Sequence, residues 1–236
     1  MKAIRCRAWG APDTLRLEEA ESPELQPHQV RIRVRAAGVN FADTLMVGGR
    51  YQVKPPFPFT PGLEAAGEVV EAGAAVGNLR ARQRVLAVLR SGGGYAEEIV
   101  LDAAAVVPIP AAMDFVTAAA FPVAYGTSNF ALTHRGHLQA GETLLVLGAA
   151  GGVGLTAVEI GKAMGARIIA AAGGVEKLDV AHSRGADELI DYRTESIRDR
   201  VRALTDGKGA DVVYDPVGAT RSTRRCGRST GRLACW

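Results

Sequence analysis

LLVLGAAGGVG, at residues 144–154, is the stretch that decides the fold. Four apolar residues lead without a polar break into a turn of small residues. Beyond the turn, apolar residues recur at helical spacing at Val153, Ala157, Ile160 and Met164. The order of these patterns predicts a strand, a tight turn and a helix.

The turn fits a fingerprint for dinucleotide binding. Ala149, Gly151 and Gly154 fill its three positions as A-x-G-x-x-G, with alanine in place of the first glycine. The N–H groups at a helix N-terminus bind a diphosphate when the turn residues lack bulk. We therefore predict a cofactor site at Ala149, Gly151, Gly152, Val153 and Gly154. The alternative is a tight strand-to-helix connection with no ligand.

Composition restricts the class of protein. A chain of 236 residues with 47% hydrophobic residues has enough apolar material for two modest domains or one large one. No apolar run approaches the roughly 20 residues of a membrane span, and the N-terminus lacks the apolar core of a signal peptide. We therefore expect a soluble, cytoplasmic protein without a membrane partner, in which Cys6 is a buried strand residue.

The formal net charge of +3 comes from one end of the chain. Five arginines lie in the last 18 residues, and removing their positive charges takes the net charge from +3 to −2. The body of the protein is thus nearly neutral, so its charge does not indicate nucleic-acid binding.

Residues 1–110 are predicted to form a β-rich domain. QVRIRVRA at residues 29–36 alternates apolar and basic side chains, as a half-buried strand does. Three further apolar runs, at 67–70, 84–89 and 96–100, are separated by turns that contain glycine or proline. We expect a small barrel that ends at VVPIP, residues 106–110, because closely spaced prolines resist helix and central strand alike.

Residues 111–218 alternate between strand and helix patterns. A helical pattern at 114–134 contains Pro122, which predicts a break. Strands are expected at 144–147, 167–172, 188–191 and 211–214, with helices near 176–184 and 195–204 between the later ones. Such alternation predicts a doubly wound parallel sheet, that is, an α/β fold in which substrate lies in the crevice between the domains.

The end of the second predicted strand indicates which dinucleotide is bound. An acid there usually holds the ribose 2′-hydroxyl of NAD, whereas this chain has Ala172 and Gly173. Lys177 is in reach of a 2′-phosphate, and Tyr192 adds a hydroxyl. We therefore predict NADPH rather than NADH; the alternatives are an ordinary solvated lysine and a tyrosine that caps the core.

Three long runs carry a family resemblance. VNFADTLMVGGRY (39–51), FPFTPGLEAAGEVVEAG (57–73) and GAAGGVGLTAVEIGKAMGA (148–166) resemble the zinc-independent quinone oxidoreductases of the zeta-crystallin type, in the medium-chain dehydrogenase/reductase superfamily. The resemblance covers residues 1–218. It implies a GroES-like β-barrel domain, then a Rossmann domain, and hydride transfer from NADPH to a quinone or enone in a homodimer.

The resemblance also implies a site without metal. Zinc-dependent relatives have a Cys and a Gly-His-Glu motif where this chain has Asn40 and Gly62-Leu63-Glu64, and neither Asn nor Leu replaces a zinc ligand effectively. By family position, Asn40, Asp43, Tyr51 and Thr127 line the nicotinamide and substrate crevice. Tyr51 either donates to a quinone oxygen or packs against residues 55–59, while Asp43 orients its neighbours. NADPH supplies the hydride, and the protein orients and polarises the acceptor.

Residues 219–236 depart from the family pattern. The run GATRSTRRCGRSTGRLACW, from Gly218, shows neither strand alternation nor an apolar helical stripe, so we interpret it as an aberrant basic tail on an incomplete Rossmann domain. A back-translation of the tail shifted by one base can be chosen to read as a family-like segment, so we hypothesise a frameshift, and the incomplete sheet predicts low stability. Two alternatives remain: a non-catalytic nucleotide- or RNA-binding protein, suggested by the basic tail, and an inactive product of a frameshifted gene.

Overall fold

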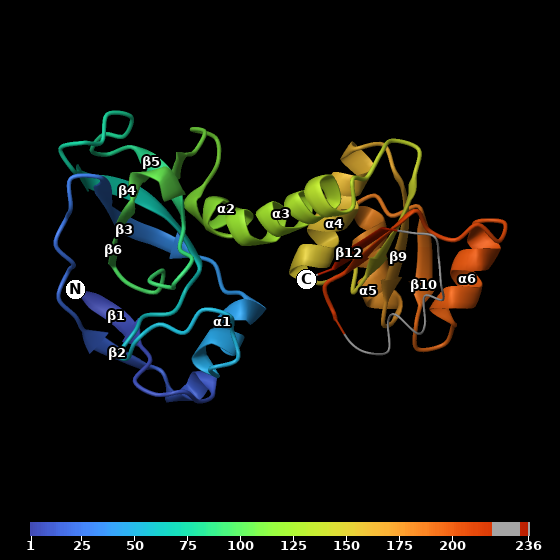
Figure 1. Ribbon diagram of the computed structural model, residues 1–236, viewed down its shortest axis with the longest axis horizontal. Coiled ribbons are helices and arrows are strands. Elements are labelled where there is room, and N and C mark those ends of the chain that lie inside the picture. The colour runs from blue at the N-terminus through green and yellow to red at the C-terminus, as the bar shows by residue number, and fades with distance from the viewer. Residues whose placement is uncertain (219–231, 236) are drawn as a thin grey trace. The chain divides into compact units, whose positions relative to one another are not determined.

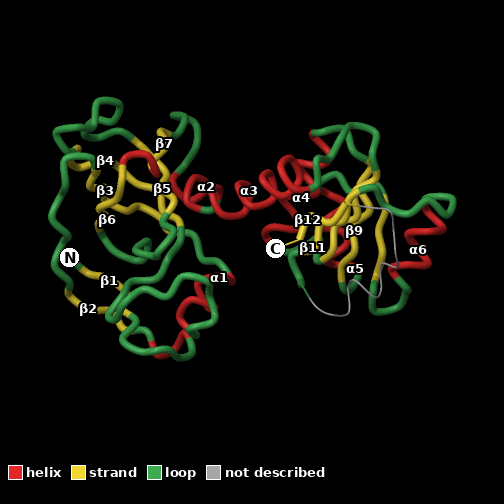
Figure 2. The backbone as a smooth tube through the Cα atoms, viewed as in Figure 1, coloured by secondary structure: helices red, strands yellow, loops and turns green. Residues whose placement is uncertain are grey.

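The computed structural model describes residues 1–218 and 232–235. It divides into two compact units, Met1–Val123 and Ala124–Trp236, which are considered separately (Figures 1 and 2). In neither described range does a helix have the length and apolar character that crossing a membrane requires. The expected domain boundaries at residues 110 and 218 remain predictions.

The first unit is built on antiparallel strands. Its main sheet has the order β6-β3-β4-β5-β7, and β1 and β2 form a separate pair. The elements are β1 (Lys2–Arg5), β2 (Arg16–Glu19), β3 (Gln29–Ala37), α1 (Phe41–Val47), β4 (Glu64–Ala72), β5 (Arg84–Val88), β6 (Glu98–Asp102), β7 (Val106–Pro108) and α2 (Phe115–Ala119). The β-rich first domain expected from the sequence is confirmed.

Strand β3 follows its sequence pattern. Val30 and Ile32 are fully buried in the main core of this unit, while Arg33 and Arg35 on the other face are exposed. Each guanidinium pairs with a glutamate on a neighbouring strand, Arg33 with Glu98 and Arg35 with Glu68. The period-two alternation therefore places one face of the sheet on the core and the other in water.

Strand β7 begins the segment of residues 106–110. This segment is expected to end the barrel and to resist helix and central strand, and its first three residues pair with β5 as an edge strand. Pro108 is accommodated because β7 is at the edge of the sheet, where a missing N–H donor breaks no ladder on the outer side.

The second unit is a parallel sheet with helices on both faces. Its strand order is β10-β9-β8-β11-β12, and every adjacent pair is parallel. The elements from Phe121 onward are α3 (Phe121–Phe130), a π-helical turn (Ala131–Arg135), β8 (Thr143–Leu147), α4 (Gly152–Ala163), β9 (Arg167–Ala172), α5 (Val175–Ser183), β10 (Glu188–Asp191), α6 (Ile197–Leu204), β11 (Val212–Asp215) and β12 (Arg232–Cys235).

Two apolar clusters lie on opposite faces of this sheet. Helices α4 and α5 pack on one face, through residues such as Ala157 and Ala181, and α6 packs on the other, through Ile197 and Val201 (Figure 1). The chain changes faces between β10 and β11, so the strand order reverses between β8 and β11. The doubly wound fold is thus confirmed, and its switch point, where such folds bind ligands, lies at the carboxyl end of β8.

The predicted break at Pro122 is present. Helix α2 ends at Ala119, and α3 begins at Phe121, so the helical pattern of residues 114–134 divides into two helices. Pro122 is the second residue of α3, where a helix needs no N–H donor within itself.

The tail contains a strand that the sequence did not reveal. We expected the sheet to end after its fourth strand, and this is wrong: β12 pairs in parallel with β11, from Arg232 opposite Val212 to Cys235 opposite Asp215. A run of four residues is too short to show a period, but the open edge of β11 offers it a ladder of donors and acceptors. The remaining positions of the proposed frameshift, 219–231 and 236, lie outside the described residues.

Candidate functional site

The glycine turn joins β8 to α4 at the switch point. Gly148 adopts φ +61°, a left-handed conformation that favours glycine, and α4 begins four residues later. Ala149 is fully buried, and its N–H donates to the carbonyl of Ala171 on β9 at 3.1 Å. The positive φ falls at Gly148, one residue before the first fingerprint position, which explains why alanine is tolerated at position 149.

The other fingerprint glycines meet two different demands. A Cβ atom on buried Gly154 would lie 2.2 Å from the backbone oxygen of Gly148, so this helix approaches the turn as only glycine allows. A Cβ on exposed Gly152 would meet nothing within 4 Å. The turn is therefore tightly packed at Gly154 and open at Gly152. Because the first N–H groups of α4 have no acceptor within the helix, this open side fits a diphosphate.

A buried hydroxyl supports this first turn of α4. Ser128 on α3 donates to the carbonyl of Val153 at 2.7 Å, and its oxygen lies 2.8 Å from the hydroxyl of Thr156 and 3.0 Å from that of Tyr214. Burial raises the pKa of the Tyr214 phenol, so the phenol stays neutral. Thr127, predicted to line the nicotinamide region, is the half-buried neighbour of Ser128 on α3.

The ends of β9 and β10 bring an acid to the region where we expected none. Ala172 ends β9 as predicted, but Asp191 at the end of β10 pairs with it in the parallel register. The Asp191 carboxylate accepts a hydrogen bond from the N–H of Gly174 at 3.1 Å. It also forms an ion pair with the Arg193 guanidinium at 3.2 Å. The Arg193 guanidinium holds the pKa of this carboxyl below its ordinary value. The acid is thus supplied by the neighbouring strand and is already neutralised.

Basic and hydroxyl groups surround the loop between β9 and α5. A Cβ on Gly173 would lie 2.9 Å from the Tyr192 hydroxyl, and one on Gly174 would lie 2.1 Å from the Arg193 guanidinium. Lys177 is exposed in the first turn of α5, which follows this loop. The structure therefore places two of the predicted residues, Gly173 and Tyr192, next to each other. It adds Arg193, whose signal in the sequence was a basic residue directly after Tyr192.

In the first unit, Asn40 and Asp43 meet at the start of α1. Asn40 is the residue before the helix, and its backbone N–H donates to the Asp43 carboxylate at 2.7 Å. The Tyr95 hydroxyl donates to the same carboxylate oxygen at 2.8 Å. The other oxygen, Oδ1, is buried without a hydrogen-bond partner among the described residues. These contacts fit the predicted role of Asp43, to orient its neighbours.

A second buried carboxylate lies beside them. Glu64, the first residue of β4, is only 2% exposed and accepts hydrogen bonds from Asn40 Nδ2 at 2.8 Å and from the N–H of Val123 at 2.7 Å. Burial raises its pKa, and the nearby charge of Asp43 adds to this effect. Sequence reasoning noted Glu64 only as part of a motif and did not identify Tyr95, because both contacts join segments far apart in the chain.

Two further features concern the position of Tyr51 and the distribution of side chains that bind metals. Tyr51 is half-buried and packs against the cluster that contains Phe59 and Leu63. This is the packing alternative for its ring, and its hydroxyl role stays a prediction. No group of three or more His, Cys, Asp or Glu that would suit a metal occurs in residues 1–218 and 232–235.

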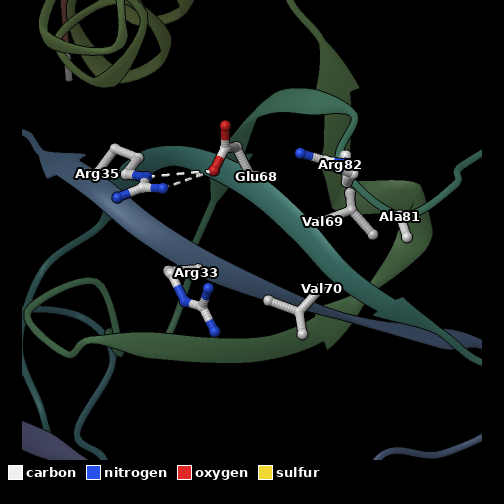
Figure 3. Close-up of a pocket in the computed structure, with 7 residues that line it drawn as sticks. All are labelled: Arg33, Arg35, Glu68, Val69, Val70, Ala81 and Arg82. Atoms are coloured by element: carbon white, nitrogen blue, oxygen red, sulfur yellow. Dashed lines mark hydrogen bonds and ion pairs between the residues drawn. The ribbon is translucent and has the colours of Figure 1, made fainter.

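None of the predicted site residues lines a hollow of about 400 Å³ in the first unit. Figure 3 shows it on the outer face of the first unit, where Arg35 on β3 reaches across to Glu68 on β4. Its lining residues are Arg33, Arg35, Glu68, Val69, Val70, Ala81 and Arg82. The distance between Arg35 Nη2 and Glu68 Oε2 is 2.8 Å, and the two side chains are 48% and 36% exposed. We regard the hollow as an ordinary charged sheet surface.

Two protein families match separate parts of the chain. The alcohol dehydrogenase GroES-like domain matches residues 26–111, and the zinc-binding dehydrogenase domain matches residues 152–235. The second match begins at Gly152, the first residue of α4, and extends to the end of strand β12.

Three similar proteins are of known sequence or structure. The quinone oxidoreductase-like protein 2 homolog of Nematostella vectensis is 45% identical over 92% of this chain, which spans 59% of that protein. A probable oxidoreductase from Mycobacterium abscessus is 40% identical, with a TM-score of 0.89 over 99% of this chain and 74% of the other. Escherichia coli quinone oxidoreductase, solved with NADPH, is 32% identical, with a TM-score of 0.88 over 99% and 72%.

Proposed function

The chain belongs to the quinone oxidoreductase family of the medium-chain dehydrogenases/reductases, and on that premise we propose that it transfers a hydride from NADPH to a quinone or enone-type acceptor. The observation that carries this proposal is the turn between β8 and α4, which is closed behind Gly154 and open at Gly152. This is the shape that a bound diphosphate requires at a switch point.

The preference for NADPH is supported by charge near the β9–α5 loop. Lys177 and Arg193 provide two cations there, and Tyr192 provides a hydroxyl. The Asp191 carboxylate is engaged by Arg193 and by the N–H of Gly174, so a ribose hydroxyl meets an acceptor that is already satisfied. A 2′-phosphate would gain charge-assisted hydrogen bonds at this loop, which NADH cannot form.

The proposed acceptor site is zinc-independent and uses residues of the first unit. The Asn40 amide and the apolar Leu63 stand where zinc-dependent relatives have ligands, and neither binds zinc effectively. NADPH supplies the hydride when bound. Asn40, Asp43, Tyr51 and Thr127 are proposed to orient the acceptor, with Tyr51 as a donor to its oxygen. The family resemblance implies a homodimer for the intact family and leaves it doubtful for this chain; a cytoplasmic location stays a prediction from the sequence.

The test is quinone-dependent oxidation of NADPH by the purified chain, with 1,4-benzoquinone as acceptor and a metal chelator present. We expect turnover that requires both NADPH and 1,4-benzoquinone and is unchanged by the chelator. Gly152→Ala, which places a methyl group on the open side of the turn, should raise the KM for NADPH. Turnover abolished by the chelator would contradict zinc independence, and no turnover together with no NADPH binding would contradict the whole proposal.

A further inference from the structure

Glu64 is held in a space shaped for its carboxylate. It is 2% exposed, and a Cβ on Gly38 would lie 2.2 Å from Glu64 Oε1, so residue 38 must be glycine to leave room for it. The main chain of Gly38 also donates to the Glu64 carbonyl at 3.2 Å. Burying a carboxyl group is costly unless it is hydrogen-bonded, so its position depends on the two donors that reach it.

The two donors are not equivalent. The N–H of Val123, in the first turn of α3, can only donate, so Glu64 Oε2 must always accept from it. The Asn40 amide can present either its nitrogen or its oxygen to Glu64 Oε1, and in the structure it presents Nδ2 at 2.8 Å. An ionised Glu64 accepts at both oxygens and fixes this orientation. Asn40 Oδ1 then faces away from Glu64.

We propose that Glu64 is a positioning residue: its protonation state sets which end of the Asn40 amide faces the acceptor, while Val123 anchors its second oxygen. A protonated Glu64 donates to Asn40 Oδ1, which turns Nδ2 outward as a donor for a carbonyl oxygen. The relevance to catalysis rests on the proposed function, whereas the orientation itself does not.

The groups that face Glu64 act on its pKa in opposite directions, so both the ionised and the protonated carboxyl are accessible. Asp43 on α1 raises the pKa of Glu64 by its charge, in addition to the larger effect of burial. Tyr95, which precedes β6, donates to Asp43 and stays neutral because burial and Asp43 raise the pKa of its phenol. The opposing influences are the hydrogen bonds from Asn40 and from the Val123 N–H on α3.

The direct test is the side-chain amide signal of Asn40 in ¹⁵N NMR spectra, assigned by its loss in Asn40→Ala. Across the pH range in which circular dichroism confirms folding, the signal should titrate in the wild type. In Glu64→Gln it should stay constant at the low-pH position, because the glutamine accepts from Val123 and donates to Asn40. The matched control Asp43→Asn should still titrate. A constant wild-type signal, or one that titrates alike in Glu64→Gln, would overturn the proposal.

A second measurement does not need Glu64→Gln to fold. The ¹³C carboxyl signal of Glu64 and the side-chain amide signal of Asn40 should titrate with the same midpoint in the wild type, because one proton drives both changes. Midpoints that differ between the two signals would overturn the proposal.

Kinetics connect the orientation to function. Above the Glu64 midpoint, Glu64→Gln should lower the KM for 1,4-benzoquinone about tenfold and leave the Kd for NADPH unchanged, since it fixes the donor outward. An unchanged or higher KM would contradict the proposed effect on the acceptor. If the wild type does not turn over at all, the proposed function fails, and the two NMR titrations still decide the positioning role.

Discussion

At the scale of single residues, two glycines of the turn have different roles: Gly154 allows close packing, and Gly152 leaves space for a ligand. The same substitution, glycine to alanine, meets the backbone oxygen of Gly148 at position 154 and open space at position 152. A backbone atom cannot move aside as a flexible side chain can. The two positions should therefore respond to the same added methyl group in different ways.

We predict that Gly154→Ala lowers the free energy of unfolding by about 1–3 kcal/mol, as overpacking does. Gly152→Ala should leave it unchanged or raise it by up to about 1 kcal/mol, because alanine restricts the unfolded chain. Urea unfolding measures both values. Gly152→Ala should nevertheless weaken NADPH binding about tenfold or more, as titration can show. Equal losses of stability in the two variants would contradict this account of the turn.

Tyr95 offers a test of the buried acid cluster. Tyr95→Phe removes a donor to the Asp43 carboxylate, which already has one oxygen without a partner among the described residues. We expect the free energy of unfolding to fall by about 1.5–3 kcal/mol near neutral pH. In an Asp43→Asn background the same change should cost less, and the difference gives the coupling between the two side chains.

The pH dependence of this effect has a definite sign. Burial and Asp43 raise the pKa of the Tyr95 phenol above its ordinary value of about 10, so its contribution is complete below that pH and is lost above it. The stability difference between wild type and Tyr95→Phe should thus shrink as the pH rises through about 10. A difference that grows over this range would refute the assignment.

Residue spacing revealed the site only where the contacts are local. The positions from Ala149 to Gly154 follow from a six-residue pattern, and Gly173 from its place after a strand. Asp191 reaches Ala172 through strand pairing, and Glu64 reaches Val123 across 59 positions of the chain. Such contacts depend on the assembled sheet, so local periodicity carries no signal for them.

At the scale of elements, buried segments were predictable and exposed ones were not. Strand β9 was predicted with its bounds, because its apolar run faces helices on both sides. Strand β2 has the sequence RLEE, which is largely exposed and shows no alternation. Helix α1 has seven residues, too few for a clear helical period, and its start depends on the Asn40–Asp43 contact.

The Ser128 hydroxyl on α3 contacts both α4 and β11, at the junction of these three elements. We predict that Ser128→Ala lowers the free energy of unfolding by about 1–3 kcal/mol, because Tyr214 and the Val153 carbonyl lose a buried partner. The matched control is Ser183→Ala, whose hydroxyl bonds locally in an exposed setting and whose loss should change stability by less than about 0.5 kcal/mol. Urea unfolding compares the two. Equal effects would show that the junction does not depend on Ser128.

At the scale of the whole molecule, the chain consists of two units with separate cores. The clusters around β3 and β4 and those around β8 and β9 share no residues. All the proposed contacts to the diphosphate and the 2′-phosphate belong to the second unit. A bound dinucleotide should therefore stabilise the second unit directly.

We predict that saturating NADPH slows backbone hydrogen exchange most at residues 148–154 and 173–177. At a concentration of about 100 times Kd, the linked stabilisation is about 2.7 kcal/mol. Strand β3 provides the internal control, since none of the proposed phosphate contacts lies there. Mass spectrometry of peptides resolves the pattern. Protection confined to the first unit would contradict the proposed site.

The central claim is that this chain binds NADPH at the glycine turn and recognises the 2′-phosphate beside β9 and β10. The most direct measurement is a fluorescence titration of the wild type, Lys177→Ala and Arg193→Ala with NADPH and NADH. We predict that the wild type binds NADPH about tenfold or more tightly than NADH, and that each substitution reduces this ratio. Lys177→Ala should have little effect on NADH, whereas Arg193→Ala should also strengthen NADH binding, because it frees the Asp191 carboxylate for the ribose 2′-hydroxyl. Equal affinity of the wild type for both dinucleotides, or tighter binding of NADH, would contradict the claim.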